Sequence, residues 1–265
     1  MLPLFISYTY LLLSTAVQIG NAAAGKINIF ILAGQSNMSG RGGVVNLTWD
    51  GYIPPESSSN PSILRLTANL SWVPAAEPLH RDIDVAKVCG VGPGMSFANS
   101  LLRKDSRRFG VVGLVPCAIG GTNISEWVRG GDLYEQMMRR AKAAVHGGGV
   151  IQGLLWYQGE SDTVSLEDAE CYKNRLHRFF VDVRADLHLP LLPVIQVALA
   201  SGSGSYIDIV REAQLGTKLE NLRTVDAKGM SLQDPERLHL TTPAQVSLGK
   251  MLSKAFLQTS NPLSS

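Results

Sequence analysis

One stretch of sequence organises the rest of the chain: Phe30-Ile31-Leu32-Ala33-Gly34-Gln35-Ser36-Asn37-Met38-Ser39-Gly40. The apolar run from Ile27 to Ala33 has the length and β-branched content of a buried strand, and it stops at Gly34. Ser36 is therefore expected at the carboxyl end of a strand, where open α/β sheets bind their ligands. This position makes Ser36 a candidate nucleophile, although a serine there can instead cap the following helix.

Strand and helix patterns alternate further along the chain. Helices are expected over 95–104, 132–145, 166–186 and 205–220 and from 242, and strands over 111–115, 151–157, 191–200 and 222–226. Such alternation predicts an α/β fold, in which helices cover both faces of a parallel sheet. At 265 residues and 45% hydrophobic, the chain can form a single domain around one sizeable core.

The first 24 residues carry no charged side chain and end in small residues. An apolar segment followed by Ala22-Ala23-Ala24 is typical of a signal peptide and its cleavage site. Residues 1–24 are thus predicted to be a signal peptide, with one domain over 25–265 and secretion of the mature protein. A membrane anchor is the alternative, since about 18 apolar residues can just span a bilayer. Once the signal is cleaved, no membrane association is expected.

Secretion fits three sequons, which begin at Asn46, Asn69 and Asn123 and are glycan acceptors in extracellular proteins. These sequons predict a glycoprotein. A fourth sequon begins at Asn37, next to the candidate nucleophile. A glycan there would fill the crevice, so this sequon is expected to stay unused.

Charge and cysteine content exclude several function classes. A net charge of +2 with scattered basic residues argues against nucleic acid as a partner. The three cysteines, Cys89, Cys117 and Cys171, are too far apart for a zinc knuckle or a redox CxxC motif. At most one disulfide can form within the chain, and Cys89 with Cys117 is a conceivable pair.

A long irregular segment covers residues 41–94. Within it, 63–66 and 70–73 have the pattern of a small hairpin. Because long loops in compact domains usually serve function, this hairpin is expected to form a flap beside the crevice.

Polar or glycine-rich clusters stand at each predicted strand end and before the last helix. A doubly wound sheet would bring together four of them: Ser36, Gly120-Gly121-Thr122-Asn123, Gln158-Gly159-Glu160-Ser161-Asp162 and Asp234-Pro235-Glu236-Arg237-Leu238-His239. Of the five histidines, only His239 lies in such a cluster.

These clusters contain the parts of an acyl-transfer site. Ser36 would attack, His239 would accept its proton, and a carboxylate would orient the imidazole. The oxyanion also needs preorganised donors. These are assigned to the Ser36 amide, a glycine amide from Gly120-Gly121 and the side-chain amide of Gln158.

Four ordered blocks carry a family resemblance: Gly34-Gln35-Ser36-Asn37-Met38, Cys117-Ala118-Ile119-Gly120-Gly121-Thr122, Trp156-Tyr157-Gln158-Gly159-Glu160-Ser161 and Leu238-His239-Leu240-Thr241-Thr242-Pro243-Ala244-Gln245. They resemble SGNH-type carbohydrate esterases, in particular the plant group similar to family-six acetylxylan esterases and sialate O-acetylesterases. The resemblance implies a flavodoxin-like, three-layer α/β/α fold. It further implies hydrolysis of O-acetyl esters on a polysaccharide or oligosaccharide, without metal or other cofactor.

One departure from the family concerns the acid. The family usually has Asp three residues before the histidine, and this chain has Glu236 there. Glu236 is the leading candidate, with Asp234 and Glu160 as alternatives. Glu160 could instead brace the crevice by accepting amides.

The resulting hypothesis is a secreted serine esterase of the cell wall or apoplast that deacetylates a polysaccharide such as xylan or pectin. The alternative is a catalytically impaired carbohydrate-binding or interaction protein on the same fold, because fold alone does not establish function. Trp127 is a candidate for sugar contact. The sugar, the acyl group and the oligomeric state are left open.

Overall fold

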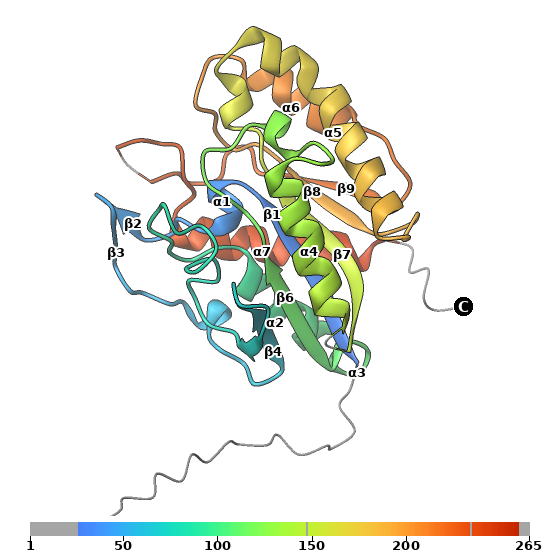
Figure 1. Ribbon diagram of the computed structural model, residues 1–265. Coiled ribbons are helices and arrows are strands. Elements are labelled where there is room, and N and C mark those ends of the chain that lie inside the picture. Colours follow the sequence, from blue (N-terminus) through green and yellow to red (C-terminus); the bar gives the residue numbers. More distant parts are fainter. Residues whose placement is uncertain (1–25, 147, 234, 260–265) are drawn as a thin grey trace, which may run out of the picture.

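The computed structural model describes residues 26–146, 148–233 and 235–259, and a seven-stranded sheet forms its centre (Figure 1). All neighbouring strands are parallel except the pair β4 and β5. In spatial order the strands are β5 (Trp72–Pro74), β4 (Ile63–Leu66), β6 (Val111–Pro116), β1 (Ile27–Gly34), β7 (Gly149–Tyr157), β8 (Val194–Ala198) and β9 (Leu222–Asp226).

Helices cover both faces of the sheet, with α4 in front of it and α7 behind it in Figure 1. One face carries α2 (Gly94–Lys104), α3 (Ser106–Phe109) and α7 (Thr242–Leu257); the other carries α4 (Asp132–His146), α5 (Leu166–Asp186) and α6 (Ile207–Gly216). Short elements complete the chain: α1 (Ser36–Ser39), the 3-10 turns Pro55–Ser57, Ile124–Trp127 and Ser161–Thr163, and the separate hairpin of β2 (Val44–Val45) and β3 (Thr48–Trp49). The predicted three-layer α/β/α fold is confirmed.

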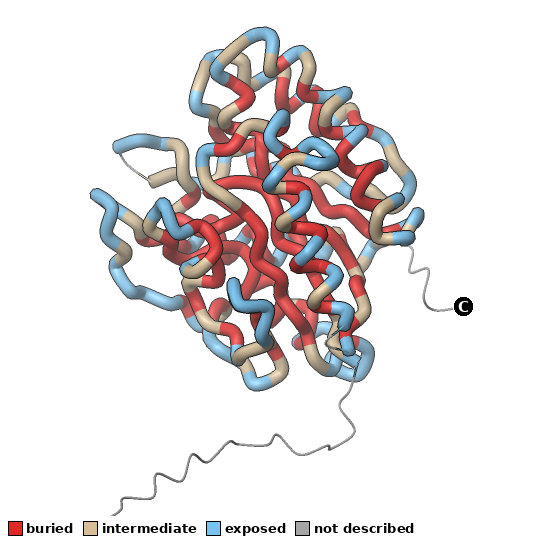
Figure 2. Tube along the Cα trace, viewed as in Figure 1, coloured by how far each residue is buried: buried red, intermediate tan, exposed pale blue. Residues whose placement is uncertain are grey.

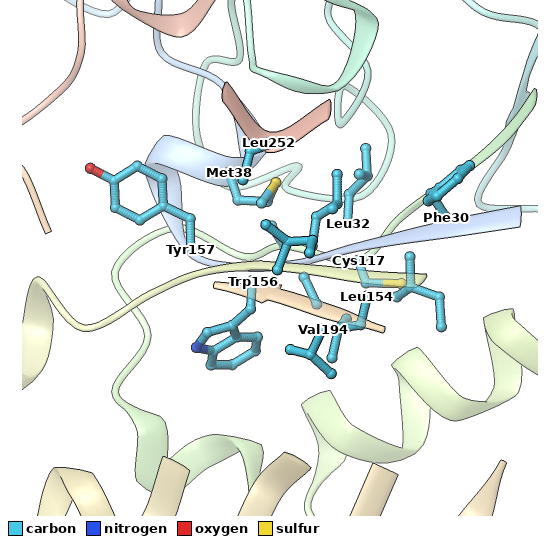
Figure 3. Close-up of a cluster of buried hydrophobic side chains, with 14 of the residues drawn as sticks. Phe30, Leu32, Met38, Cys117, Leu154, Trp156, Tyr157, Val194 and Leu252 are labelled. Carbon is cyan, nitrogen blue, oxygen red and sulfur yellow. The ribbon is translucent and has the colours of Figure 1, made fainter. Parts of the chain in front are cut away.

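The core lies on both sides of the sheet, because successive side chains of a strand point to opposite faces. Phe30 of β1 packs edge-on against Phe97 of α2 and Phe256 of α7, at 4.9 Å between ring centroids in each case. On the other face, Trp156 of β7 packs against Phe179 of α5. Figure 3 shows Trp156 and its neighbour Tyr157 on opposite sides of the strand, and Figure 2 shows the buried chain concentrated along the sheet.

Trp127 belongs to this second aromatic layer. Its ring is fully buried, lies 5.2 Å from that of Trp156, and donates its indole N–H to Thr122 Oγ1. The expectation that Trp127 contacts sugar is therefore wrong, because the core covers the whole ring.

The predicted hairpin at residues 63–73 exists, but it is not a flap. Its first strand, β4, pairs in parallel with β6, so the hairpin extends the main sheet at one edge. Ile63 and Leu66 of β4 are fully buried, and this burial holds the hairpin against the core. A different hairpin, β2–β3, overhangs the site described below.

The five consecutive strands β6, β1, β7, β8 and β9 have the spatial order 2-1-3-4-5 when numbered along the chain. This is the flavodoxin-like order, in which the chain changes direction of winding between the first and third of these strands, here β1 and β7. The crevice at the carboxyl ends of β1 and β7 is therefore the expected ligand site.

Three further expectations concern the chain outside this crevice. The predicted signal peptide lies outside the described residues. No helix in the described ranges combines the length and the apolar character needed to cross a bilayer. All three cysteines are free, so the structure does not contain the conceivable disulfide between Cys89 and Cys117.

Candidate active site

A tight turn after β1 positions Ser36. Gly34 has a φ of +125°, and a Cβ atom there would lie 2.1 Å from the carbonyl oxygen of Tyr157 in β7. Only glycine avoids this collision, since other residues rarely adopt such a φ. The Gln35 amide donates to the Tyr157 carbonyl at 2.8 Å, and the Ile119 amide donates to the Gly34 carbonyl at 3.0 Å. The turn is thus bonded to the last residue of β7 and to the chain that follows β6.

The structure brings Ser36 and His239 together although 203 residues separate them. The Nε2 atom of His239 lies 3.1 Å from the Oγ atom of Ser36. This distance is within the hydrogen-bonding range required of a nucleophile and its base.

Asn37 holds the segment that carries His239. Its Oδ1 atom accepts the Leu240 amide at 2.9 Å, and its Nδ2 atom donates to the Leu238 carbonyl at 3.3 Å. Both residues that flank His239 are therefore bound by one fully buried side chain. The same Nδ2 atom donates to Glu160 Oε1 at 2.7 Å.

From the sequence, Asn37 stands out as a sequon and as part of the Gly34–Met38 block, and neither feature predicts its positioning contacts. Its place directly after Ser36 was the available signal. Because the Asn37 amide is buried and bonded at both ends, the folded protein has no room for a glycan there.

The three candidate acids have different surroundings. Glu236 Oε2 lies 3.9 Å from His239 Nδ1, and the Glu236 side chain is 76% exposed. Glu160 is fully buried and braces Asn37 rather than the imidazole. Asp234 lies outside the described residues. Among the described carboxylates, only Glu236 comes within 4 Å of an imidazole nitrogen of His239.

Two of the predicted oxyanion donors are occupied by other acceptors. The Gly120 amide donates to Asp84 Oδ2 at 3.1 Å. The Gln158 side-chain amide donates to Asp162 Oδ2 at 2.5 Å and to the Thr122 carbonyl at 3.0 Å. The predictions for Gly120 and Gln158 are corrected accordingly, because the sequence does not show that Asp84 and Asp162 contact these amides in the folded chain.

Gly121 and Ser36 both line the open cavity at this end of the sheet. Gly121 is exposed, and a Cβ atom there would meet nothing within 4 Å. These two residues remain as sources of backbone amides for an oxyanion.

The cavity over Ser36 has a volume of about 360 Å³. The β2–β3 hairpin forms one wall through Val44, Val45, Asn46 and Leu47, and Leu47 is 81% exposed. Volumes of this size are usual for small-molecule sites and exceed what an acetyl group alone would fill. Across the described ranges, no three His, Cys, Asp or Glu side chains are grouped so as to hold a metal ion.

Burial keeps the imidazole of His239 neutral. The pKa of His239 is lowered to about 4, chiefly by burial and also by the nearby Arg41 charge, while Glu236 acts in the opposite direction. A neutral imidazole at pH 7 can accept a proton, as a general base must.

Comparison with known proteins bears on what this site does. Residues 26–258 match the family model described as carbohydrate esterase, sialic acid-specific acetylesterase. The chain belongs to this carbohydrate esterase family. Family membership makes it a carboxylic ester hydrolase and supports the hydrolysis of O-acetyl esters on carbohydrates.

The esterase is similar to a protein from Arabidopsis thaliana described as a probable carbohydrate esterase. The two are 56% identical over 235 residues, which cover 86% of this chain and 90% of the relative. The X-ray structure of that Arabidopsis protein superposes with a TM-score of 0.85 at 55% identity, covering 88% of this chain and 98% of the other.

Two more distant structures share the fold of the esterase. NanS has a TM-score of 0.69 at 17% identity, with 88% of this chain and 97% of NanS covered. A carbohydrate acetylesterase from Xanthomonas citri has a TM-score of 0.58 at 18% identity, with 86% of this chain and 55% of the other covered.

The lowered pKa of His239 predicts the pH dependence of the esterase. As pH rises, activity should increase when the imidazole loses its proton, near a pKa of about 4, and then stay level from pH 6 to 8. The measurement is kcat/KM for acetate release from an uncharged aryl acetate. A rise centred near the unperturbed value of about 6.5 would show that the imidazole is not desolvated.

A second prediction concerns the buried carboxyl of Glu160. Burial raises the pKa of Glu160 from 4.5 to about 7, so between these values the folded protein holds a proton that the unfolded chain has lost. The contribution of Glu160 to stability therefore falls as pH rises from 4.5 to 7. Glu160→Gln, which resembles the protonated form, should gain on the order of 3 kcal/mol relative to wild type over this interval.

The measurement is the free energy of unfolding in denaturant at several pH values for wild type and Glu160→Gln. Glu212→Gln, a change at an exposed glutamate, is the matched control. A constant difference between wild type and Glu160→Gln across pH would contradict the assignment.

Proposed function

We propose that this carbohydrate esterase is a secreted serine esterase that removes acetyl groups from a cell-wall polysaccharide. Ser36 is the nucleophile, His239 is the general base and Glu236 is the acid of the triad. The observation that carries the proposal is the 3.1 Å contact between Ser36 Oγ and the His239 imidazole, at the floor of an open cavity.

In the first half of the reaction, Ser36 Oγ attacks the acetyl carbonyl carbon and His239 Nε2 takes the hydroxyl proton. The carbonyl oxygen becomes an oxyanion, which accepts the amides of Ser36 and Gly121. The tetrahedral intermediate then breaks its bond to the sugar oxygen. That oxygen leaves with the proton from His239, and the acetyl group stays on Ser36.

Water completes the reaction by the same route. His239 takes a proton from water as the water oxygen attacks the acetyl-serine carbonyl. The second intermediate expels Ser36 Oγ, which recovers its proton from His239, and acetate departs.

Glu236 supports this cycle from the solvent side. An acid near Nδ1 favours the tautomer whose Nε2 is free to accept the serine proton. Because Glu236 is 76% exposed, water screens its charge, and its effect is smaller than that of a buried triad carboxylate.

The size and walls of the cavity support a carbohydrate substrate. It has room for a sugar unit around the ester, and the apolar residues of the β2–β3 hairpin offer a surface for the apolar face of a sugar ring. Secretion is supported by the apolar, uncharged pattern of residues 1–24.

The experiment that tests the function is hydrolysis of an aryl acetate by wild type and Ser36→Ala. Loss of the nucleophile should lower kcat by about 10³-fold or more. Ser203→Ala is the matched control, because Ser203 also lines the cavity but, within the described residues, forms no hydrogen bond with His239. Acetate release from a panel of acetylated polysaccharides then identifies the polymer.

If wild type and Ser36→Ala release acetate equally, the proposal is wrong. Binding of the same polysaccharides would then be measured, because a carbohydrate-binding protein on the esterase fold is the alternative.

Replacement of the acid tests the triad. Glu236→Gln should lower kcat about 10-fold, well short of the roughly 10⁴-fold loss known for a buried triad carboxylate. Glu135→Gln, at another exposed glutamate, should have no effect. Asp234→Asn and Glu160→Gln are assayed beside them. If Glu236→Gln keeps full activity and one of the variants Asp234→Asn and Glu160→Gln loses it, the acid of the triad is the residue replaced in the inactive variant.

A further inference from the structure

A buried ion pair, Arg41–Asp84, lies directly behind the candidate oxyanion site. The guanidinium of Arg41 binds Asp84 Oδ2, and the side chains are only 6% and 1% exposed. Burying two charges is costly, and replacing such a pair by apolar side chains is often neutral or stabilising. The role of this pair therefore lies in the groups that it contacts.

The Asp84 carboxylate joins the two segments that supply the oxyanion amides. Its Oδ2 atom binds Ser39 Oγ at 2.9 Å, in the turn that begins with Ser36, and accepts the Gly120 amide at 3.1 Å. Three donors thus converge on one carboxylate oxygen: Ser39 and Arg41 from the turn after the nucleophile, and the Gly120 amide from the glycine loop.

Arg41 strengthens the same junction. Its Nη1 atom donates to Ser39 Oγ at 2.7 Å and to the Gly40 carbonyl at 3.0 Å, so the guanidinium binds the end of the nucleophile turn. A Cβ atom on Gly120 would lie 2.5 Å from Arg41 Nη2 and 3.5 Å from the Cβ atom of Ser36. The glycine backbone therefore packs directly between the ion pair and the nucleophile.

We propose that Asp84 is a positioning residue for the oxyanion hole, acting with Arg41. By binding the Gly120 amide, Asp84 fixes the peptide between Ile119 and Gly120. The next peptide carries the Gly121 amide, which is thereby directed to the carbonyl oxygen of the substrate. Through its bond to Ser39, Asp84 also fixes the position of the Ser36 turn relative to the Gly120–Gly121 loop. The inference rests on the proposed ester hydrolysis at Ser36.

The chain offers a matched control for this role. Asp82, two residues away, pairs with the buried guanidinium of Arg65 on β4 and accepts the Ala68 amide. Within the described residues, the hydrogen bonds of Asp82 go to Arg65 and Ala68, and none goes to the Ser36 turn or to Gly120. Asp82→Asn and Asp84→Asn each leave a buried arginine without its carboxylate, so both should lower the melting temperature. Only Asp84→Asn should also disturb the oxyanion site.

The experiment compares kcat and KM for an aryl acetate in wild type, Asp84→Asn and Asp82→Asn, below the melting temperature of each. Asp84→Asn should lower kcat by about 10²-fold with little change in KM, as loss of oxyanion stabilisation does. Asp82→Asn should keep the wild-type kcat. Inhibition by a boronic acid, whose serine adduct is tetrahedral, should weaken by a similar factor in Asp84→Asn alone.

A second variant keeps the test valid if Asp84→Asn fails to fold. The double change of Arg41→Met with Asp84→Leu removes both charges, so neither is left buried and unpaired. It also removes the acceptor for the Gly120 amide. This double variant should fold and show the same loss of kcat and of boronic acid affinity.

Wild-type kcat in the folded double variant would overturn the positioning role, as would equal kcat in Asp84→Asn and Asp82→Asn. Failure of the proposed function gives a different result, because Ser36→Ala would then match wild type whatever Asp84 does.

Discussion

One buried side chain, that of Asn37, links the turn that carries Ser36 to the segment that carries His239. Asn37 follows the nucleophile directly, and its amide binds the backbone on both sides of the histidine. Two parts of the chain more than 200 residues apart are thereby held as one unit. The Gln245 side chain in α7 adds a further bond to the Asn37 carbonyl at 3.1 Å, which connects this unit to the helix that follows it.

Asp84, Glu160 and Asp162 are buried around this unit. Asp84 accepts the Gly120 amide, Asp162 accepts the Ile124 amide, and Glu160 accepts the side-chain amide of Asn37 in α1. Buried carboxylates are costly unless they are hydrogen-bonded. Here the hydrogen bonds of these carboxyl groups fix segments at the carboxyl end of the sheet that no strand pairing holds. The positions of the candidate catalytic residues therefore depend on buried hydrogen bonds as well as on the hydrophobic core.

The β2–β3 hairpin gives the cavity a different character on its outer side. Its valine and leucine side chains face the opening, while the inner side presents Ser36, His239 and the glycine loop. Membership of the carbohydrate esterase family accounts for the inner side. The apolar outer wall is suited to the flat, partly apolar surface of a sugar ring next to the ester.

Much of this architecture could be predicted from residues 27–257 read in order. Helices and strands arise from local periodicity, so the alternating pattern predicted nearly every layer element. The carboxyl-end rule then placed Ser36, Gly121 and His239 at one edge. Even there, one local pattern misled: the hairpin at 63–74 joins the sheet because β4 pairs with β6, a contact that no local signal contains.

Only the tertiary structure decided which partners the buried polar groups bind. Asp84 stands in an irregular loop, and nothing near it in sequence shows that it meets Arg41, Ser39 and Gly120. For the same reason, the sequence could not show that the Gly120 and Gln158 amides are occupied, that Glu160 serves Asn37, or that burial lowers the pKa of His239. Hydrogen bonding and desolvation depend on distance in space, whereas sequence patterns report on neighbours along the chain.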